Sequence, residues 1–280
     1  MEISEKNQIN DRIRVCISLL SNDNINWILF MINHINDYVI CDHFITLNLN
    51  THDQINGLLC SGNLPNNVFI TDPIPKQWGT HYTILAGHMA NVEYACQQKM
   101  YFSHVLFMAS NCIFYRKLDD FGLINVMKNG NSNLSPPIPF AERNNNWSWK
   151  PWKCKVLFRV IWKFKHKHYW HTLIEGTVLP AAVMKDFLQD GGVWQDVIAR
   201  SRILPETAFF FPFEEVFLQT FSETLYPNVY KNVLHMAESN NILSEIKQLL
   251  CNEKNTIYMI KRVNRNVSEV TELIENISAL

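Results

Sequence analysis

The sequence lacks the cysteine spacing of a zinc site or a disulfide framework. Its seven cysteines form no CxxC or CxxH pair, are widely spaced and are odd in number. A zinc ribbon and a set of structural disulfides are therefore not expected. We expect reduced, mostly buried thiols and a cytoplasmic protein.

Long apolar runs and the common nucleotide-binding motifs are also missing. The stretch Trp27–Ile32 is far shorter than the roughly 20 residues that span a bilayer. The polar first residues, which include Glu2, Glu5 and Asp11, are unlike a signal peptide. No GxGxxG, Walker A or GxSxG pattern occurs. We expect a soluble chain whose only contact with a membrane would be peripheral.

An excess of charge of one sign is lacking too. Lysine and arginine number 25 against 26 acidic residues, a net charge of -1, so no global basic field attracts nucleic acid. Hydrophobic residues make up 47% and aromatic residues 12% of the chain, which excludes a disordered protein, a coiled coil and a collagen-like fibre. The 280 residues suffice for one to two domains of about 150 residues.

What the sequence does contain is an alternation of apolar strands and amphipathic helices. Buried strands are predicted at 13–20, 43–50, 68–71 and 104–109, and helices at 25–35, 52–59 and 80–99. Further helices are expected at 181–188, 214–225, 233–250 and 267–280, with a strand at 256–260. This order predicts an α/β fold with a mostly parallel central sheet flanked by helices.

Polar residues end two of the predicted strands. Asn48 and Asn50 close the second strand, and Ser110 and Asn111 follow the strand at 104–109. Because ligands of open α/β sheets bind beyond the carboxyl ends of the strands, we expect these four residues near a binding site.

The segment 147–171 combines aromatic and basic residues. It contains Trp147, Trp149, Trp152, Trp162 and Trp170 among several lysines, and no acidic residue occurs between Glu142 and Glu175. Such a segment could stack bases and hold phosphates. It could equally stack sugar rings and bind an acidic glycan, or form an amphipathic element with buried aromatics and solvated lysines.

Glu214 and Glu215 open a predicted helix directly after the apolar stretch Phe209–Phe213. One interpretation is helix capping, because carboxylates are favoured at helix N-termini. The other is a general base against an apolar wall, where burial raises the pKa toward a useful range. Adjacent helical residues do not face each other, so we expect only one of the two to face a site.

Three cationic residues, Lys261, Arg262 and Arg265, follow the late strand. They form either a solvated surface or a clamp that neutralises a diphosphate in place of a metal ion.

Metal ligands are poorly represented in the sequence. The histidines His166, His168 and His171 have lysines rather than carboxylates beside them. The acidic pair at 119–120 lacks the Asp-x-Asp form that would hold Mg²⁺ or Mn²⁺ against a diphosphate. We expect neither a metal nor another cofactor.

Taken together, these residues resemble the core-2/I-branching β-1,6-N-acetylglucosaminyltransferase family with its xylosyltransferase relatives. Five segments in order carry the resemblance: His43–Asn50, Gln77–Asn111, Glu175–Pro180, Phe213–Thr220 and Ile257–Val263. Phe213–Thr220 is similar to the family motif Pro-Asp-Glu-His-Phe-Trp-Ala-Thr, whose Glu is the catalytic base.

The resemblance implies a GT-A-type glycosyltransferase fold and a role for each candidate residue. Glu215 stands at the position of the catalytic base and Glu214 at that of the neighbouring acid, on the acceptor side with Trp149 and Trp152. Lys261, Arg262 and Arg265 would contact the diphosphate. Asn50, Ser110 and Asn111 would seat the donor.

The implied function is inverting, metal-independent transfer of a sugar from a nucleotide-sugar, a UDP-sugar by resemblance, to a glycan hydroxyl. The chain would be one domain over residues 1–280, with a nucleotide-binding half over 12–128 and an acceptor and catalytic half over 129–280. Two alternatives stay open: a catalytically inactive glycan-binding protein, and a nucleic-acid-binding protein that uses segment 147–171. The near-zero charge argues against nucleic acid as a partner, and the same segment could contact a membrane or an acidic glycan.

Overall fold

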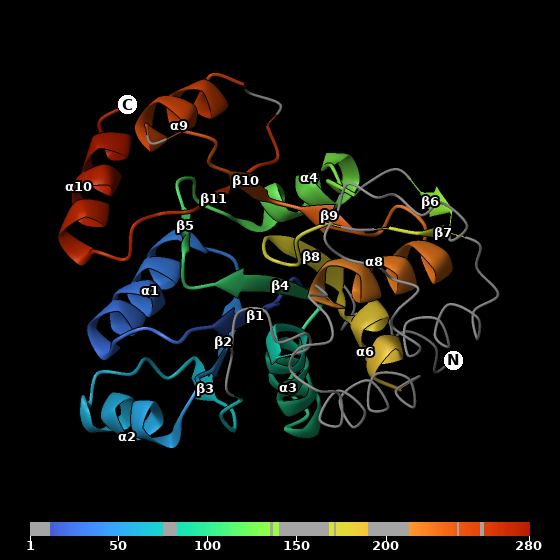
Figure 1. The fold of residues 1–280 in the computed structure, drawn as a ribbon, viewed down its shortest axis with the longest axis horizontal. Helices are drawn as coiled ribbons and strands as arrows, with labels where there is room; N and C mark the ends of the chain where they lie inside the picture. The colour runs from blue at the N-terminus through green and yellow to red at the C-terminus, as the bar shows by residue number, and fades with distance from the viewer. Residues whose placement is uncertain are drawn as a thin grey trace, which may run out of the picture.

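The computed structural model describes residues 12–74, 83–134, 137–139, 168–170, 172–189, 213–239, 241–252 and 255–280. Within them a six-stranded sheet has the order β3-β2-β1-β4-β8-β9 (Figure 1). Its strands are β1 (Val15–Leu20), β2 (His43–Asn48), β3 (Val68–Ile70), β4 (His104–Ala109), β8 (Thr177–Pro180) and β9 (Lys231–Asn232). The first four pair in parallel, and β8 and β9 are antiparallel to their neighbours. The predicted mixed α/β fold with a largely parallel central sheet is confirmed.

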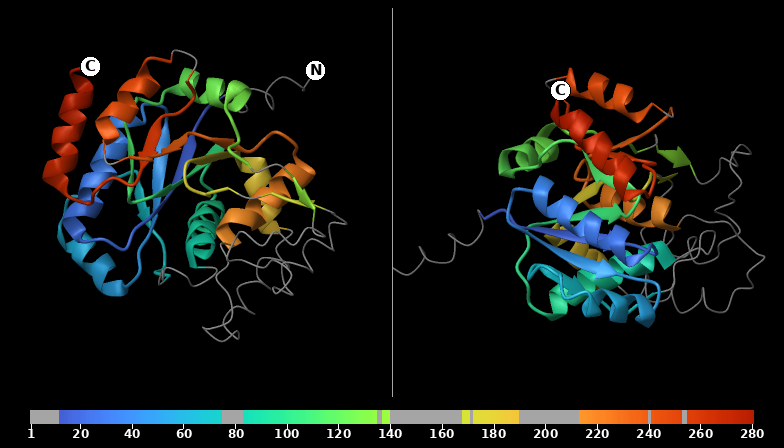
Figure 2. Two further views of the ribbon diagram at one scale, coloured as in Figure 1. Left: turned by 45° about the horizontal axis from the view of Figure 1, so that its top comes forward. Right: turned by 90° about the vertical axis from the view of Figure 1, so that its left-hand side faces the viewer.

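Helices cover both faces of this sheet (Figure 2). Alternate residues of β1 feed two separate cores: Ile17 and Leu19 pack into one, and Cys16 packs into the other. The first core receives side chains of α1 (Ile25–Tyr38), α2 (His52–Cys60), α4 (Asp120–Asn129), α9 (Ile242–Leu250) and α10 (Val267–Ser278). The second receives α3 (Thr83–Gln97), α6 (Ala181–Gln189) and α8 (Phe213–Leu225). Burial on both faces explains why β1 is an almost unbroken apolar run.

A small second sheet brings the end of the chain to the end of β4. It contains β10 (Leu234–Met236), β11 (Met259–Lys261) and β5 (Cys112–Phe114), in the order β10-β11-β5. The strand β5 follows β4 after a two-residue turn, and β11 runs antiparallel to it. Helix α10 then packs beside α1 and α9 (Figure 1). A further pair of short strands, β6 (Ile138–Pro139) and β7 (His168–Tyr169), is antiparallel.

One predicted helix is wrong. The segment 233–250 is not a continuous helix, because its first part forms β10 and only Ile242–Leu250 is helical. Strand β10 pairs with β11, more than twenty residues away, and this long-range pairing overrides the local helical spacing of apolar residues. The helix begins where the side chain of Asn241 caps it by accepting a hydrogen bond from the backbone N–H of Ser244.

Candidate active site

The carboxyl ends of three parallel strands meet at one edge of the large sheet. Leu20 of β1 is the register partner of Asn48 in β2 and of Ala109 in β4. The backbone N–H of Ser21 donates to the carbonyl of Asn48 at 3.3 Å, and that of Ser110 donates to the carbonyl of Leu20 at 3.0 Å. The residues that follow these strands therefore lie together, as the sequence predicts.

Asp23 links this edge to the C-terminal part of the chain. Its Oδ2 accepts hydrogen bonds from the hydroxyls of Ser21, at 2.9 Å, and Ser110. Its Oδ1 lies 2.9 Å from Nη1 of Arg265. The Asp23 side chain is 8% exposed, whereas that of Arg265 is 45% exposed. A largely buried carboxylate is thus paired with a cation that reaches solvent.

A second ion pair lies beside the same edge. In the small sheet Lys261 is the register partner of Cys112, which follows the turn at Ser110 and Asn111. The Nζ of Lys261 lies 2.7 Å from Oε1 of Glu175, and the two side chains are 13% and 9% exposed. Lys261 and Arg265 are therefore both placed near the turn at Ser110 and Asn111, one by the pairing of β11 with β5 and the other by its ion pair with Asp23.

Glu175 is held by a tight turn. The next residue, Gly176, has a φ of +76°, in the left-handed region that glycine tolerates best. A Cβ at this position would lie 2.2 Å from Cβ of Leu234, so glycine is also required for space. The N–H of Gly176 donates to the carbonyl of Phe107 at 2.7 Å, which places Glu175 at the end of β4.

The thiol of Cys112 lies near Glu175, Lys261 and Arg265 but stays uncharged. Burial, and next the nearby carboxylate of Glu175, raise its pKa to about 12, while Lys261 and Arg265 act in the opposite direction. The thiol stays protonated at neutral pH, so we assign it no nucleophilic role.

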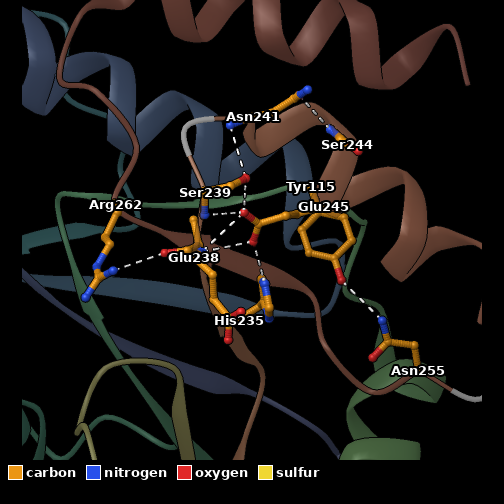
Figure 3. Close-up of polar contacts among 10 residues, drawn as sticks. Tyr115, His235, Glu238, Ser239, Asn241, Ser244, Glu245, Asn255 and Arg262 are labelled. Carbon is orange, nitrogen blue, oxygen red and sulfur yellow. Dashed lines mark hydrogen bonds and ion pairs between the residues drawn. The ribbon is translucent and has the colours of Figure 1, made fainter.

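Arg262 makes a different contact from its two cationic neighbours. Its backbone has a φ of +74°, and its Nη1 donates to the carbonyl of Ala237 at 3.1 Å, at the start of the connection from β10 to α9 (Figure 3). That connection is ordered by Glu245, whose carboxylate accepts from the backbone N–H groups of Glu238 and Ser239. Hydrogen bonds from Ser239 and from His235 hold the pKa of Glu245 down at about 2.

The asparagines at the edge order their own loops. Asn48 donates to Oγ1 of Thr71 at 2.8 Å and to the carbonyl of Asp72 at 2.7 Å. The N–H of Asn50 donates to Oε1 of Gln54 at 3.0 Å. Asn111 accepts at its carbonyl a 3.4 Å hydrogen bond from the N–H of residue 263. The structure thus brings Ser110 and Asn111 next to the cations and places Asn50 in the adjacent loop after β2.

The predicted catalytic and acceptor residues are described only in part. Glu214 and Glu215 lie in the first turn of α8, which begins at Phe213, one residue before the predicted start. Their side chains lie outside the described residues, as do Trp149 and Trp152. Their roles stay predictions.

Two acidic residues of this site were not among the sequence-based candidates. Asp23 lies just before α1 but does not cap it, because Asn24 takes the cap by accepting from the N–H of Trp27. No local signal marks Asp23, because its partners Ser110 and Arg265 are distant in sequence. A signal did exist for Glu175, the first acid after a long basic segment and directly before a glycine.

The described residues contain no group of three or more His, Cys, Asp or Glu side chains placed to hold a metal ion. In the same part of the chain, every helix is too short or too polar to cross a bilayer.

In comparisons with known proteins, no family model and no curated protein matches this chain. Among solved structures it is similar to the apo structure of WbbM, a bifunctional glycosyltransferase, at 16% identity and a TM-score of 0.35. The match covers 95% of this chain and 50% of the other, so the chain spans about half the length of that protein. A likeness this low defines neither fold nor function, and we infer the function from the chain's own residues.

Proposed function

We propose that this protein is a glycosyltransferase that moves a sugar from a nucleotide-sugar to a hydroxyl of a glycan. The observation that carries the proposal is that two cations flank the turn at Ser110 and Asn111, at the carboxyl edge of the parallel strands. Lys261 is the register partner of Cys112, and Arg265 pairs with Asp23, which accepts a hydrogen bond from Ser110. This edge is where open α/β sheets bind their ligands. Each cation is paired with a carboxylate, Lys261 with Glu175 and Arg265 with Asp23. Two cations at this edge suit a diphosphate, which is the leaving group of a nucleotide-sugar.

The reaction is a single displacement with inversion at the anomeric carbon. Glu215, at the start of α8, removes the proton from the acceptor hydroxyl as its oxygen attacks that carbon. The bond to the nucleoside diphosphate breaks, and the electron pair leaves with the diphosphate oxygen. General base catalysis of this kind typically contributes about 10²- to 10⁴-fold in rate.

Lys261 and Arg265 stabilise the negative charge that develops on the leaving diphosphate, so the reaction needs no metal. Removal of one such stabilising group typically raises a barrier by about 3 kcal/mol. Asn50, Ser110 and Asn111 seat the nucleotide, for which UDP is the first candidate. Arg262 supports the clamp from the β10–α9 connection, and Trp149, Trp152 and Glu214 bind the acceptor glycan.

The test is a thermal-shift screen with UDP, GDP, CMP and their common sugar conjugates, each with and without EDTA. We expect stabilisation by one nucleotide and its sugar conjugate, and we expect this stabilisation to persist in EDTA. When glycan acceptors are then added to the sugar conjugate, transfer should release the free nucleotide. Stabilisation that EDTA removes would contradict metal independence. No shift with any nucleotide would overturn the transferase assignment and favour a glycan- or nucleic-acid-binding function.

A further inference from the structure

Asp23 is the residue through which several parts of the candidate site are connected. Its carboxylate accepts from Ser21 and Ser110 and pairs with Arg265, which lies just before α10. Its backbone carbonyl accepts from Nε2 of Gln54, in the first turn of α2, at 3.0 Å. The loops that follow β1, β4 and β11 and the first turn of α2 therefore meet at one acid whose side chain is largely buried.

The exposure of this pair is asymmetric. Asp23 is 8% exposed and its oxygens already accept hydrogen bonds from protein donors, whereas Arg265 is 45% exposed. A guanidinium has five N–H donors in a rigid planar fork, and the contact with Asp23 at 2.9 Å is made through Nη1. The carboxylate is placed to hold the guanidinium rather than to bind a ligand itself.

We propose that Asp23 is a positioning residue that fixes Arg265 for contact with the diphosphate of the donor, an inference that rests on the proposed function. A free arginine loses about 2 kcal/mol of rotamer entropy when a ligand immobilises it. A side chain fixed beforehand loses less, and preorganisation of this kind increases affinity. Ser21 and Ser110 in turn donate hydrogen bonds to the carboxylate. Because Ser110 is itself placed at the nucleotide, a double-mutant cycle with Arg265 is needed to show that the effect passes through the guanidinium.

The experiment is a double-mutant cycle measured by isothermal titration of the full chain with UDP and with GDP. We expect Asp23→Asn to weaken binding about tenfold, in line with the loss of a preorganised charged contact. In the Arg265→Ala background the same substitution has no further effect, because the side chain that it positions is gone. Asp53→Asn, which changes an exposed acid in the first turn of α2, is the matched control and leaves affinity unchanged.

Two further measurements distinguish the positioning role of Asp23 from a role in folding alone: a comparison of ligands and a second variant. Asp23→Asn should weaken inorganic pyrophosphate as much as UDP and leave uridine unaffected, because only the phosphates contact Arg265. Should Asp23→Asn fail to fold, Ser21→Ala removes one hydrogen bond from the carboxylate. It should weaken UDP by about two- to fivefold, again only when Arg265 is present.

The two levels of inference fail in different ways. Wild-type protein that binds neither UDP, GDP nor pyrophosphate overturns the proposed function and the role of Asp23 together. Wild-type binding with unchanged affinity in Asp23→Asn overturns the positioning role alone. Tighter binding in Asp23→Asn means that the carboxylate competes with the diphosphate, and additive losses in the double variant mean that Asp23 acts independently of Arg265. Either result also overturns the positioning role.

Discussion

The ammonium of Lys261 lies 2.7 Å from the carboxylate of Glu175, and both side chains are largely buried at the junction of the two sheets. Removal of one member of such a pair leaves the other charge poorly solvated. Lys261→Met should therefore lower the free energy of unfolding by about 2–4 kcal/mol. Urea denaturation measures this loss, and adding Glu175→Gln should recover part of it. Unchanged stability of Lys261→Met would show that the pair contributes little.

The charge-neutral pair of substitutions also separates stability from ligand binding. Lys261→Met with Glu175→Gln should fold yet bind UDP at least tenfold more weakly, because the diphosphate loses a charge-assisted contact worth about 1.5–3 kcal/mol. Glu175→Gln alone keeps the cation and serves as the control. Wild-type affinity in the double variant would remove Lys261 from the proposed clamp.

The turn at Gly176 is expected to be one of the least tolerant positions of the chain. Gly176→Ala places a Cβ 2.2 Å from Cβ of Leu234 at a φ of +76°, so backbone and strand must shift. We expect a loss of about 3 kcal/mol in unfolding free energy and weaker nucleotide binding, because Glu175 moves with the turn. Gly62→Ala is the control: its φ is +68° but no atom lies within 4 Å, so only the backbone penalty of about 1–2 kcal/mol remains. Equal losses in the two variants would contradict the steric argument.

The central sheet could be predicted from sequence because its strands are buried on both faces. The almost unbroken apolar runs of β1 and β4 predict both strands to within two residues of their observed bounds. Strands β5, β9 and β10, of two or three residues each, were missed or assigned to a helix. Such short segments acquire their structure from distant partners, which local periodicity does not encode.

In the candidate site, too, local sequence predicts some residues, whereas others depend on contacts between distant segments. Ser110 was predicted from its position after a strand, and Lys261 from its place in a late basic cluster. Their proximity depends on the antiparallel pairing of β11 with β5. The role of Asp23 depends on contacts with Ser110 and Arg265, at separations of 87 and 242 residues, so neighbouring residues gave no indication of it.

Glu215 is the residue on which the proposed chemistry depends most. Glu215→Gln removes the base and should reduce the transfer rate by about 10²- to 10⁴-fold, with donor affinity unchanged. Glu214→Gln is the neighbouring comparison: adjacent helical residues point in different directions, so it should raise the KM for acceptor with a smaller effect on kcat. Single-turnover kinetics with a saturating donor distinguishes the two. Near-normal turnover in Glu215→Gln would show that another group takes the proton.

The acceptor site can be tested through the tryptophans of the basic–aromatic segment. Trp149→Ala and Trp152→Ala should raise the KM for the acceptor glycan more than that for the donor. Loss of one aromatic stacking surface is worth about 1–3 kcal/mol, by analogy with stacked bases, which corresponds to at least fivefold in affinity. Steady-state kinetics with each substrate varied in turn measures the two constants. Equal effects on both would indicate a role in folding instead.

Stability should depend on pH through His34, a buried residue of α1. Burial lowers its pKa from 6.5 to about 4. Its Nε2 accepts a 3.0 Å hydrogen bond from the backbone N–H of Phe114 in β5, which a protonated nitrogen could not accept. Between pH 6.5 and 4 the unfolded chain therefore binds a proton that the folded chain does not. The free energy of unfolding is at its full value above pH 6.5 and falls as the pH drops toward 4, by about 3 kcal/mol.

His34→Gln, which keeps a hydrogen-bond acceptor but cannot titrate, should flatten this dependence in urea titrations at pH 4 to 7. Burial also lowers the pKa of His43 and His104, so the slope should decrease rather than vanish. The exposed His52→Gln variant is the control and should retain the wild-type slope. An unchanged slope in His34→Gln would mean that the ring of His34 takes up the proton in the folded wild-type protein as well. In that case acidification would break the hydrogen bond from the N–H of Phe114, which supports β5 beside Lys261.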